Sequence, residues 1–262
     1  MKLDRNNYYS ADANREYWSA SLVKEFLSCP ARAVAELKGE YERPKTSALL
    51  IGSYVDACFS GGDEMEIFLA ENPDIVNKRT GELKADFRKA QAMYERAASD
   101  ELFMHYMEGD HQAILTGDVV GFPFKARFDV YVPGKRIVDL KTTKDMQPVW
   151  KAGEGRITFA DAWNWPLQLA IYQAIEGNDL PCYLAVITKE DPPDISVIQI
   201  EQDKLDSELA FLAEKMPLFD AMKQGIIEPE RCETCAYCRQ TKKLKEVLTL
   251  EHYENLGGNN IE

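Results

Sequence analysis

The chain has 262 residues, of which 45% are hydrophobic, and its formal net charge is −13. A chain of this composition can bury the core of one domain, and it contains no apolar run long enough to span a membrane. The acidic balance argues against a protein that coats nucleic acid, because neutralising phosphates requires Lys and Arg on the contact face. The first residues lack the apolar stretch of a signal peptide, so we expect one cytoplasmic domain over residues 1–262.

The amino-terminal part is predicted to be helical over residues 15–40. Ser21 is expected to cap a helix that runs to Cys29, and Pro30 to begin a second helix that ends at Gly39. The segment SALLIGSYVDACF predicts a further helix, in which Gly52 and Asp56 share a face because they are four residues apart. The charged stretch that follows is expected to form scaffold helices.

The segment KARFDVYVPGKRIVDLKTT predicts a β-hairpin after a first strand at 112–119. Residues 124–132 and 136–142 alternate as strands do, and Pro133-Gly134-Lys135 suits a three-residue loop. That loop length places Asp129 opposite Asp139 and Val130 opposite Val138. One face then collects the apolar residues and the other the polar residues: Phe128, Val130, Val132, Val138 and Leu140 against Arg127, Asp129, Tyr131, Asp139 and Lys141.

Two apposed carboxylates repel each other unless a cation lies between them. Mg²⁺ prefers oxygen ligands and uses one or two protein carboxylates together with phosphate oxygens. Lys141 projects from the same predicted face, where an ammonium can orient water and stabilise charge on a phosphate. The alternative is an ion-pair ladder on a solvated sheet face.

A second helical segment follows the hairpin in DAWNWPLQLAIYQAIEG. Gln168 and Tyr172 are four residues apart on it, and Gly177 is its expected end. Trp163 and Trp165 are expected to pack the start of this helix against the core rather than to stack on a base. Two strands, CYLAVITKE and DISVIQIEQ, and a long helix at 202–224 complete the core. The predicted fold is mixed α/β, with a central mixed sheet that contains an antiparallel meander and is flanked by helices.

Taken together, these motifs resemble the PD-(D/E)XK nuclease superfamily and its RecB-like branch, which includes exonucleases of the exodeoxyribonuclease VIII (RecE) kind. The resemblance covers residues 48–176 and implies a restriction-endonuclease-like fold with a core at about 46–200. Asp129 matches the first motif acid, although Phe128 replaces the usual proline, and Asp139-Leu140-Lys141 matches the (D/E)XK triplet. By resemblance, Mg²⁺ or Mn²⁺ is held by Asp129, Asp139 and the carbonyl oxygen of Leu140.

The remaining roles also follow from the resemblance. Gln168 and Tyr172 match the QxxxY motif that supports the active site, and Tyr172, Arg127 and Lys144 are candidates for contact with DNA. Asp56 stands where the family has histidine, so it is either a third metal ligand or a neighbour of the ligands. The implied activity is exonucleolytic cleavage of linear duplex DNA from the 5′ end in phage or prophage recombination, with a single-strand annealing recombinase as partner and a homo-oligomeric assembly.

Cysteines provide a second signal. Cys232, Cys235 and Cys238 form a Cys-x2-Cys-x2-Cys run, and Cys29 precedes a proline far upstream. Four thiolates can hold Zn²⁺ or an iron-sulfur cluster, and the layout is similar to the [4Fe-4S] staple of AddB-type and CRISPR-adaptation nucleases. Such a site would pack the segment 226–245 against helices 15–40. The alternative is a set of reduced thiols without metal.

Two other functions remain open on the sequence. One is an iron-sulfur nuclease that acts on single strands, which the cysteines favour. The other is a catalytically silent DNA-binding module, which the Asp56 departure and the acidic balance permit.

Overall fold

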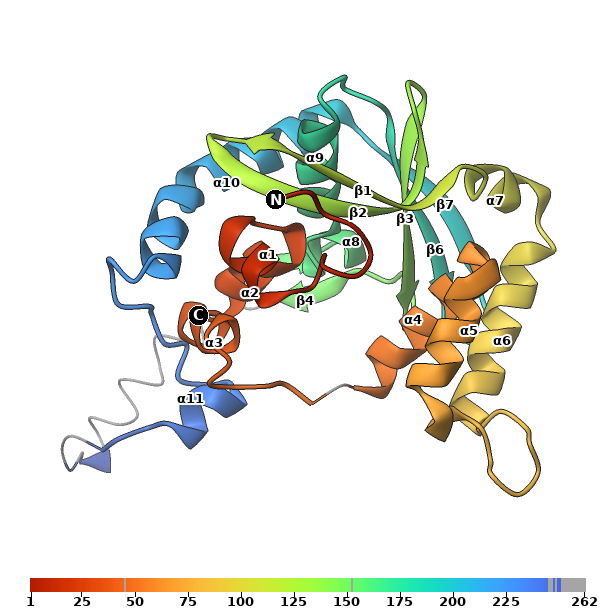
Figure 1. Cartoon of the computed structure of the whole chain (residues 1–262), viewed down its shortest axis with the longest axis horizontal. Coiled ribbons are helices and arrows are strands. Elements are labelled where there is room, and N and C mark those ends of the chain that lie inside the picture. Colours follow the sequence, from red (N-terminus) through yellow and green to blue (C-terminus); the bar gives the residue numbers. More distant parts are fainter. Residues whose placement is uncertain (45, 152, 245–246, 248, 251–262) are drawn as a thin grey trace.

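The computed structural model describes residues 1–44, 46–151, 153–244, 247 and 249–250 (Figure 1). A five-stranded sheet lies at its centre, in the spatial order β1-β2-β3-β6-β7. The strands are β1 (Asp110–Val119), β2 (Phe122–Val132), β3 (Arg136–Thr143), β6 (Cys182–Thr188) and β7 (Ile195–Ile200). The predicted mixed α/β fold with an antiparallel meander is confirmed.

The sheet combines two kinds of connection. β1, β2 and β3 follow one another as antiparallel neighbours, and β7 runs antiparallel to β6. β6 pairs with β3 in parallel, from Ile137 opposite Cys182 to Thr143 opposite Thr188. A parallel neighbour requires a crossover. This crossover carries the small hairpin β4 (Val149–Lys151) and β5 (Gly155–Ile157), followed by α8 (Phe159–Ala162) and α9 (Trp165–Glu176).

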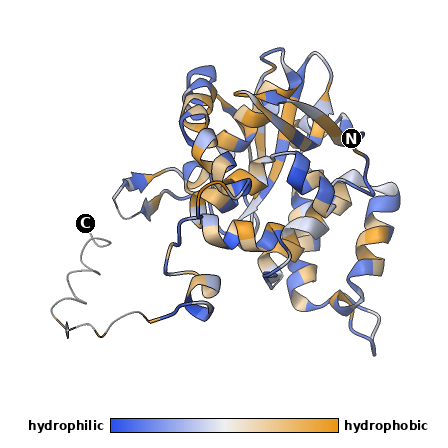
Figure 2. Cartoon of the chain, turned by 60° about the vertical axis from the view of Figure 1, so that its left-hand side comes forward, coloured by the Kyte–Doolittle hydropathy of each residue, from blue (hydrophilic) through white to orange (hydrophobic). Residues whose placement is uncertain are grey.

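Helices cover both faces of the sheet. One hydrophobic core lies under α2 (Ala20–Ser28), α3 (Pro30–Leu37), α9 and α10 (Gln202–Lys223). The other lies under α4 (Ser47–Ser60), α5 (Gly62–Glu71), α6 (Ala85–Ala98) and α7 (Glu101–Tyr106). Shorter helices are α1 (Ala11–Glu16), a 3₁₀ turn at Pro73–Ile75 and α11 (Ala236–Gln240). Figure 2 shows hydrophobic and hydrophilic bands on these helices, as expected of elements with one buried face.

α9 packs very closely on the sheet. A Cβ atom added to Gly117 of β1 would lie 3.1 Å from the carbonyl oxygen of Ile175, so the strand and the helix approach where β1 has no side chain. Nine of the twelve residues of α9 are buried. Any polar side chain on this helix must therefore find partners inside the protein.

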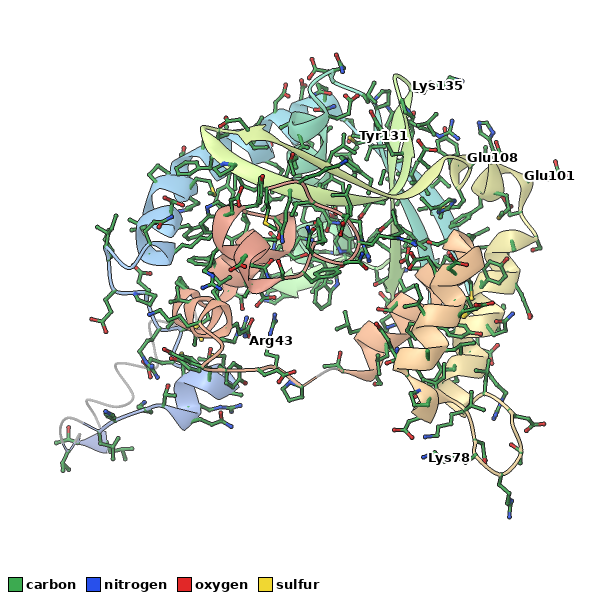
Figure 3. All side chains as sticks on the ribbon, viewed as in Figure 1. Arg43, Lys78, Glu101, Glu108, Tyr131 and Lys135 are labelled. Atoms are coloured by element: carbon green, nitrogen blue, oxygen red, sulfur yellow. The ribbon has the colours of Figure 1, made fainter. Side chains whose placement is uncertain are left out.

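Several element boundaries differ from the predictions: β1 begins at Asp110 and not at 112, β2 begins at Phe122 and not at 124, and two further differences concern helices. Ser19, and not Ser21, caps α2, because its side chain accepts the N–H of Leu22. The predicted helix over DAWNWPLQ is broken between α8 and α9, where Asn164 has left-handed backbone angles. The hairpin loop at 133–135 is as predicted, and Figure 3 labels Lys135 at its tip.

Within the described residues, no helix is both long and apolar enough to cross a membrane. Residue 245, the last of the predicted cysteine segment, lies outside the described residues, as do residues 251–262 of the predicted domain.

Candidate active site and cysteine site

The hairpin strands separate at Asp129. The predicted register is confirmed by three pairs, among them Val130 opposite Val138. Beyond these pairs, the N–H of Leu140 donates to Asp129 Oδ2 at 2.8 Å. A carboxylate therefore takes the place that a main-chain carbonyl would occupy in a continued ladder, and the side chain of Asp129 lies between the two strands.

The predicted single apolar face of the hairpin is wrong at Phe128. Its ring lies 4.8 Å from that of Tyr172 on α9, whereas Val130 packs in the core under α4. Tyr131 lies on the same side of the sheet as Phe128, because its hydroxyl donates to Glu176 of α9. The alternation of side chains is thus interrupted at Asp129, because the strand does not keep a regular pleat where its ladder to β3 opens.

Gln112 is a site residue that the sequence analysis missed. It lies in β1 between the paired residues His111 and Ala113, and its φ of 57° is in the left-handed region. Its buried amide donates to both carboxylate oxygens of Asp56, at 2.9 and 3.1 Å. A non-glycine residue with positive φ is the kind of irregularity that sequence patterns do not reveal.

Asp139 is fully buried and held from two sides. Lys141 forms an ion pair with Asp139 Oδ2, and the amide of Gln168 donates to Asp139 Oδ1 at 2.8 Å. The same amide nitrogen lies 3.0 Å from the hydroxyl of Tyr172, which in turn donates to the carbonyl of Arg127 at 3.3 Å. The two motif residues of α9 thus join the two hairpin strands.

Lys24 of α2 is a second residue that the sequence analysis missed. Its ammonium donates to Gln168 Oε1 at 2.7 Å, so both ends of this half-buried amide are bonded. Burial, aided by the positive charge of Lys141, lowers the pKa of Lys24 to about 7. Nothing in the local sequence of α2 marks this lysine, because its partner lies 144 residues away.

The three aspartates form an electrostatically unfavourable cluster. Burial, together with repulsion from Asp139 and Asp56, raises the pKa of Asp129 well above its usual value. Burial also raises the pKa of Asp56 to about 6, against the opposing effects of Arg127 and Lys141. Burial alone would lower the pKa of Lys141, but Asp139 and Asp129 outweigh it and raise that pKa.

A divalent cation would relieve this repulsion, and the donors are hard oxygens of the kind that Mg²⁺ and Mn²⁺ prefer. The residues present therefore fit such an ion. In the part of the chain that the structure describes, however, the four cysteines are the group of metal-binding side chains that gathers most closely, and the three aspartates are not gathered in that way.

Two clefts meet at Asp129. The first is lined by Asp56, Asp129, Leu140 and Lys141, and also by Lys144, whose side chain is 94% exposed. The second is lined by Arg127, Tyr172 and Tyr9, and the guanidinium of Arg127 lies 5.2 Å from the centre of the Tyr9 ring. Tyr172 is only 7% exposed, so most of its ring belongs to the core.

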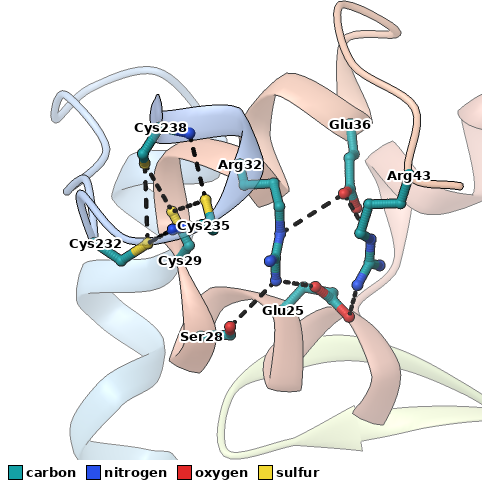
Figure 4. Close-up of polar contacts among 9 residues, drawn as sticks. All are labelled: Glu25, Ser28, Cys29, Arg32, Glu36, Arg43, Cys232, Cys235 and Cys238. Carbon is teal, nitrogen blue, oxygen red and sulfur yellow. Dashed lines mark hydrogen bonds and ion pairs between the residues drawn. The ribbon is translucent and has the colours of Figure 1, made fainter. Parts of the chain in front are cut away.

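The four cysteines singled out in the sequence lie together between α3 and α11 (Figure 4). The Sγ atom of Cys29 is 3.6 Å from that of Cys238 and 3.9 Å from that of Cys235. Cys232 Sγ is 3.9 Å from Cys238 Sγ, and all four sulfurs lie within 4.8 Å of one another. Cys58 and Cys182 lie elsewhere, in α4 and β6.

Two of the cysteine sulfurs accept hydrogen bonds from main-chain N–H groups. The N–H of Cys235 donates to Cys232 Sγ at 3.3 Å, and the N–H of Cys238 donates to Cys235 Sγ at 3.4 Å. Burial would raise the pKa of Cys232, but hydrogen bonds from Thr234 and Cys235 lower it to about 6. Burial raises the pKa of Cys29. The hydrogen bonds in the segment that contains Cys232 thus favour its thiolate, which is the form that binds metal.

An ion-pair network lies beside the cysteines on the side of α2 and α3. Arg43, on the connector to α4, pairs with Glu25 and with Glu36, each at 2.7 Å. Arg32 pairs with the same two glutamates, at 2.6 and 3.7 Å. Figure 3 places Arg43 on the connector between the two groups of helices, so the network attaches this connector to α2 and α3.

Comparison with known families shows which family the chain belongs to. A model described as "PDDEXK-like domain of unknown function" matches residues 19–241. The chain belongs to this PDDEXK-like family. The motifs that suggested the PD-(D/E)XK superfamily, and the strands and helices that carry them, lie within the matched residues.

One solved structure agrees with this membership. The crystal structure of a "putative exonuclease" from Eubacterium rectale is 38% identical in sequence, with a TM-score of 0.91, and the alignment covers 95% of this chain and 97% of that one. The structure of SSO0001 aligns with a TM-score of only 0.34 at 15% identity, over 84% of this chain and 96% of that one. No curated protein matches the chain. Family and structural neighbour together support a nuclease.

Proposed function

We propose that this chain is a divalent-metal-dependent DNA exonuclease that hydrolyses phosphodiester bonds of linear duplex DNA. The observation that carries the proposal is the buried Asp139, which is bonded to Lys141 and Gln168 beside the strand opening that holds Asp129. A structural ion pair would not need a second, partly buried acid next to it. The relative named as an exonuclease, with which the chain shares nearly its whole length, supports the same reaction class.

Asp129, Asp139 and the carbonyl oxygen of Leu140 would hold Mg²⁺ or Mn²⁺, with Asp56 as a further ligand or a neighbour of the ligands. The bound ion would supply a Lewis acid for the phosphate and lower the pKa of water. Lys141 remains protonated beside the acids, so its ammonium positions the attacking water and stabilises negative charge on the phosphate. Gln168 and Tyr172 keep Asp139 in place, and Arg127, Lys144 and Tyr172 border the path of the strand.

The direction of digestion and the biological setting are part of the same proposal. By resemblance to exonucleases of the RecE kind, the enzyme would digest from 5′ to 3′ and leave a 3′ overhang. A single-strand annealing recombinase in phage or prophage recombination would then receive this product. A homo-oligomer in the cytoplasm is the corresponding assembly.

The decisive experiment compares end-labelled linear duplex with nicked circular duplex, in Mg²⁺, Mn²⁺ or EDTA. Wild-type protein should release mononucleotides from linear ends in either metal and none in EDTA. Asp139→Asn should abolish release, and Lys141→Met should slow it by roughly 10²- to 10³-fold, as expected when a charge-stabilising group is lost. Asp203→Asn, an exposed acid in the first turn of α10, is the matched control. DNA that stays intact in every metal would refute the proposal.

We propose that the four cysteines hold a metal that joins the two ends of the chain. Around one tetrahedral Zn²⁺ with Zn–S bonds of about 2.3 Å, sulfurs lie about 3.8 Å apart. The Sγ–Sγ separations of 3.6 and 3.9 Å match this spacing. A [4Fe-4S] cluster places four irons among its ligands and needs wider spacing, so the distances favour Zn²⁺ over the iron-sulfur cluster.

Metal analysis after anaerobic purification distinguishes Zn²⁺ from an iron-sulfur cluster. One zinc per chain in colourless protein is expected. A brown protein that absorbs near 400 nm would instead support the second candidate function, an iron-sulfur nuclease of AddB or CRISPR-adaptation type that acts on single strands. The gathered cysteines keep this candidate open. A third candidate, a silent DNA-binding module, would bind DNA without cutting it.

A further inference from the structure

The cleft that contains the acids has a chemically different far end. Besides Asp56, Asp129 and Lys141, its lining includes an apolar group formed by Val149, Phe159, Trp163 and Trp165. A nucleotide has the same two parts, a charged phosphate and a flat apolar base. The volume of the cleft, about 1090 Å³, is slightly larger than that of a typical small-molecule site, so it has room for a nucleotide.

The two neighbouring tryptophans have opposite environments. Trp165 is 7% exposed, and its ring packs against that of Phe159 with centres 5.8 Å apart, as predicted. Trp163 is 61% exposed, so the prediction that it packs against the core is wrong. The left-handed conformation of Asn164, with φ of 51° and ψ of 41°, separates them. This turn ends α8 and leaves the Trp163 ring at the cleft.

An exposed tryptophan beside an active-site cleft requires an explanation. Leaving a large aromatic surface in water forgoes the favourable free energy of burial, and Trp163 forgoes it where lysines also line the cleft. Lys144 and Lys189 belong to the same lining, so positive charge and an aromatic ring occur together on a chain whose net charge is −13. Grooves that bind single-stranded nucleic acid combine these two features.

We propose that Trp163 is a stacking platform for one unpaired base of the DNA strand whose phosphate enters the acidic part of the cleft. This subsite rests on the proposed nuclease function and specifies its substrate further: the nucleotide next to the cleavage point is unpaired when it is bound. Phe159 and Trp165 line the same cleft as the platform, and Lys144 and Lys189 of that lining would contact the backbone of the same strand.

The neighbouring hairpin offers a matched control. Trp150 of β4 is 78% exposed and pairs with Arg156 of β5. β4 contacts α8, and the two elements lie close together in Figure 1. Val149 lines the cleft, but Trp150 is not among the described residues that do so. Trp150→Ala therefore removes an exposed indole of the same region without altering the proposed platform.

The test measures binding of fluorescent single strands that carry one abasic site at each of the first four positions. It uses the full chain in the Asp139→Asn background with Ca²⁺ at low salt, so that the DNA stays intact. We expect one abasic position to weaken binding, and Trp163→Ala to weaken binding of the intact strand by roughly 5- to 100-fold, the effect of one lost stacked base. On the strand with that abasic position, Trp163→Ala should cause no further loss of affinity. On the intact strand, Trp163→Phe should retain most of the affinity, and Trp150→Ala should bind as tightly as its parent.

Equal binding by Trp163→Ala and its parent on every strand would overturn the platform. A uniform loss on all strands, or a change in sedimentation showing that Trp163 joins two copies of the chain, would overturn it as well. A hydrolysis assay on the chain with Asp139 intact tests the nuclease hypothesis independently of the platform hypothesis. Active enzyme with unchanged Trp163→Ala binding rejects only the platform, whereas inactive enzyme with the expected binding pattern rejects only the nuclease.

Discussion

The acidic site and the cysteine site are assembled in opposite ways. Asp129 and the N–H that it binds are 11 residues apart on one hairpin, whereas Cys29 and Cys238 are 209 residues apart and meet between two helices. The acidic site offers hard oxygens that repel one another, and the cysteine site offers soft sulfurs supported by N–H donors. The first is suited to an ion that works on a substrate, and the second to an ion that holds structure.

One helix connects the two sites. α2 carries Lys24, which bonds to Gln168 in the acidic site, and Cys29 directly follows the helix. A loss at either site can therefore reach the other through α2. The following changes test this connection and the contrast between the two sites, from the largest expected effect to the smallest.

Cys29→Ser should have the largest effect. It removes the one ligand from the amino-terminal part, so metal should be lost and the segment around α11 should become sensitive to protease. Because structural zinc contributes to folding free energy directly, we expect a loss of several kcal/mol, which can be measured by chemical unfolding together with metal content. Cys58→Ser, in α4 and away from the cluster, is the control. Unchanged metal content in Cys29→Ser would contradict the proposed four-cysteine site.

Asp56 should make the metal-free protein sensitive to pH. Its pKa in the folded protein is about 6, above the usual value of 3.8, so its protonated form favours folding and this contribution is lost as pH rises through this range. The difference corresponds to about 3 kcal/mol. In EDTA, the stability of wild type relative to Asp56→Asn should therefore fall between pH 4 and pH 6.

Mn²⁺ should restore the stability of the wild type above pH 6 and should stabilise Asp56→Asn less, because that variant keeps Asp129 and Asp139 but lacks the third carboxylate. Unfolding by denaturant over a pH series measures both effects, with Asp203→Asn as the control. Parallel curves for wild type and Asp56→Asn would show that Asp56 is not the titrating group.

Lys24→Met should reduce activity while the fold is retained. The change keeps the aliphatic stem but leaves Gln168 Oε1 without its donor, so Asp139 is held less firmly. Losing such a supporting contact typically costs about 10- to 100-fold in activity or metal affinity. The pH–rate profile near pH 7 should also change, because burial lowers the pKa of Lys24 to about 7.

Lys89→Met, at an exposed position of α6, is the control for Lys24→Met. Full activity with an unchanged pH profile in Lys24→Met would show that α2 does not connect the two sites.

Arg43→Ala should have the smallest effect. Arg43 is 44% exposed, so its ion pairs with Glu25 and Glu36 are screened by water and contribute about 1 kcal/mol at most. Thermal unfolding should shift by a few degrees, and Arg15→Ala, which removes a more exposed pair with Asp12, should shift less. A large loss of activity in Arg43→Ala would mean that the connector has a direct role at the cleft.

Local patterns predicted most of the fold. The hairpin loop, its register with Val130 opposite Val138, and the helices around Gly52 and Gln168 follow from alternation, loop length and helix periodicity. Phe128 was misplaced because the prediction assumed an uninterrupted pleat through Asp129. Trp163 was misplaced because a single left-handed residue, Asn164, divides what periodicity treats as one helix.

The sequence by itself determined which residues have the chemistry for each site: the hairpin acids, the triplet lysine and the four cysteines. These are local or compositional features, and short-range geometry is sufficient to find them. Only the tertiary structure decided that Gln112 supports Asp56 and that Lys24 supports Gln168. Such contacts depend on how distant elements pack around buried polar groups that must find partners, and no pattern along the chain encodes the distance between them.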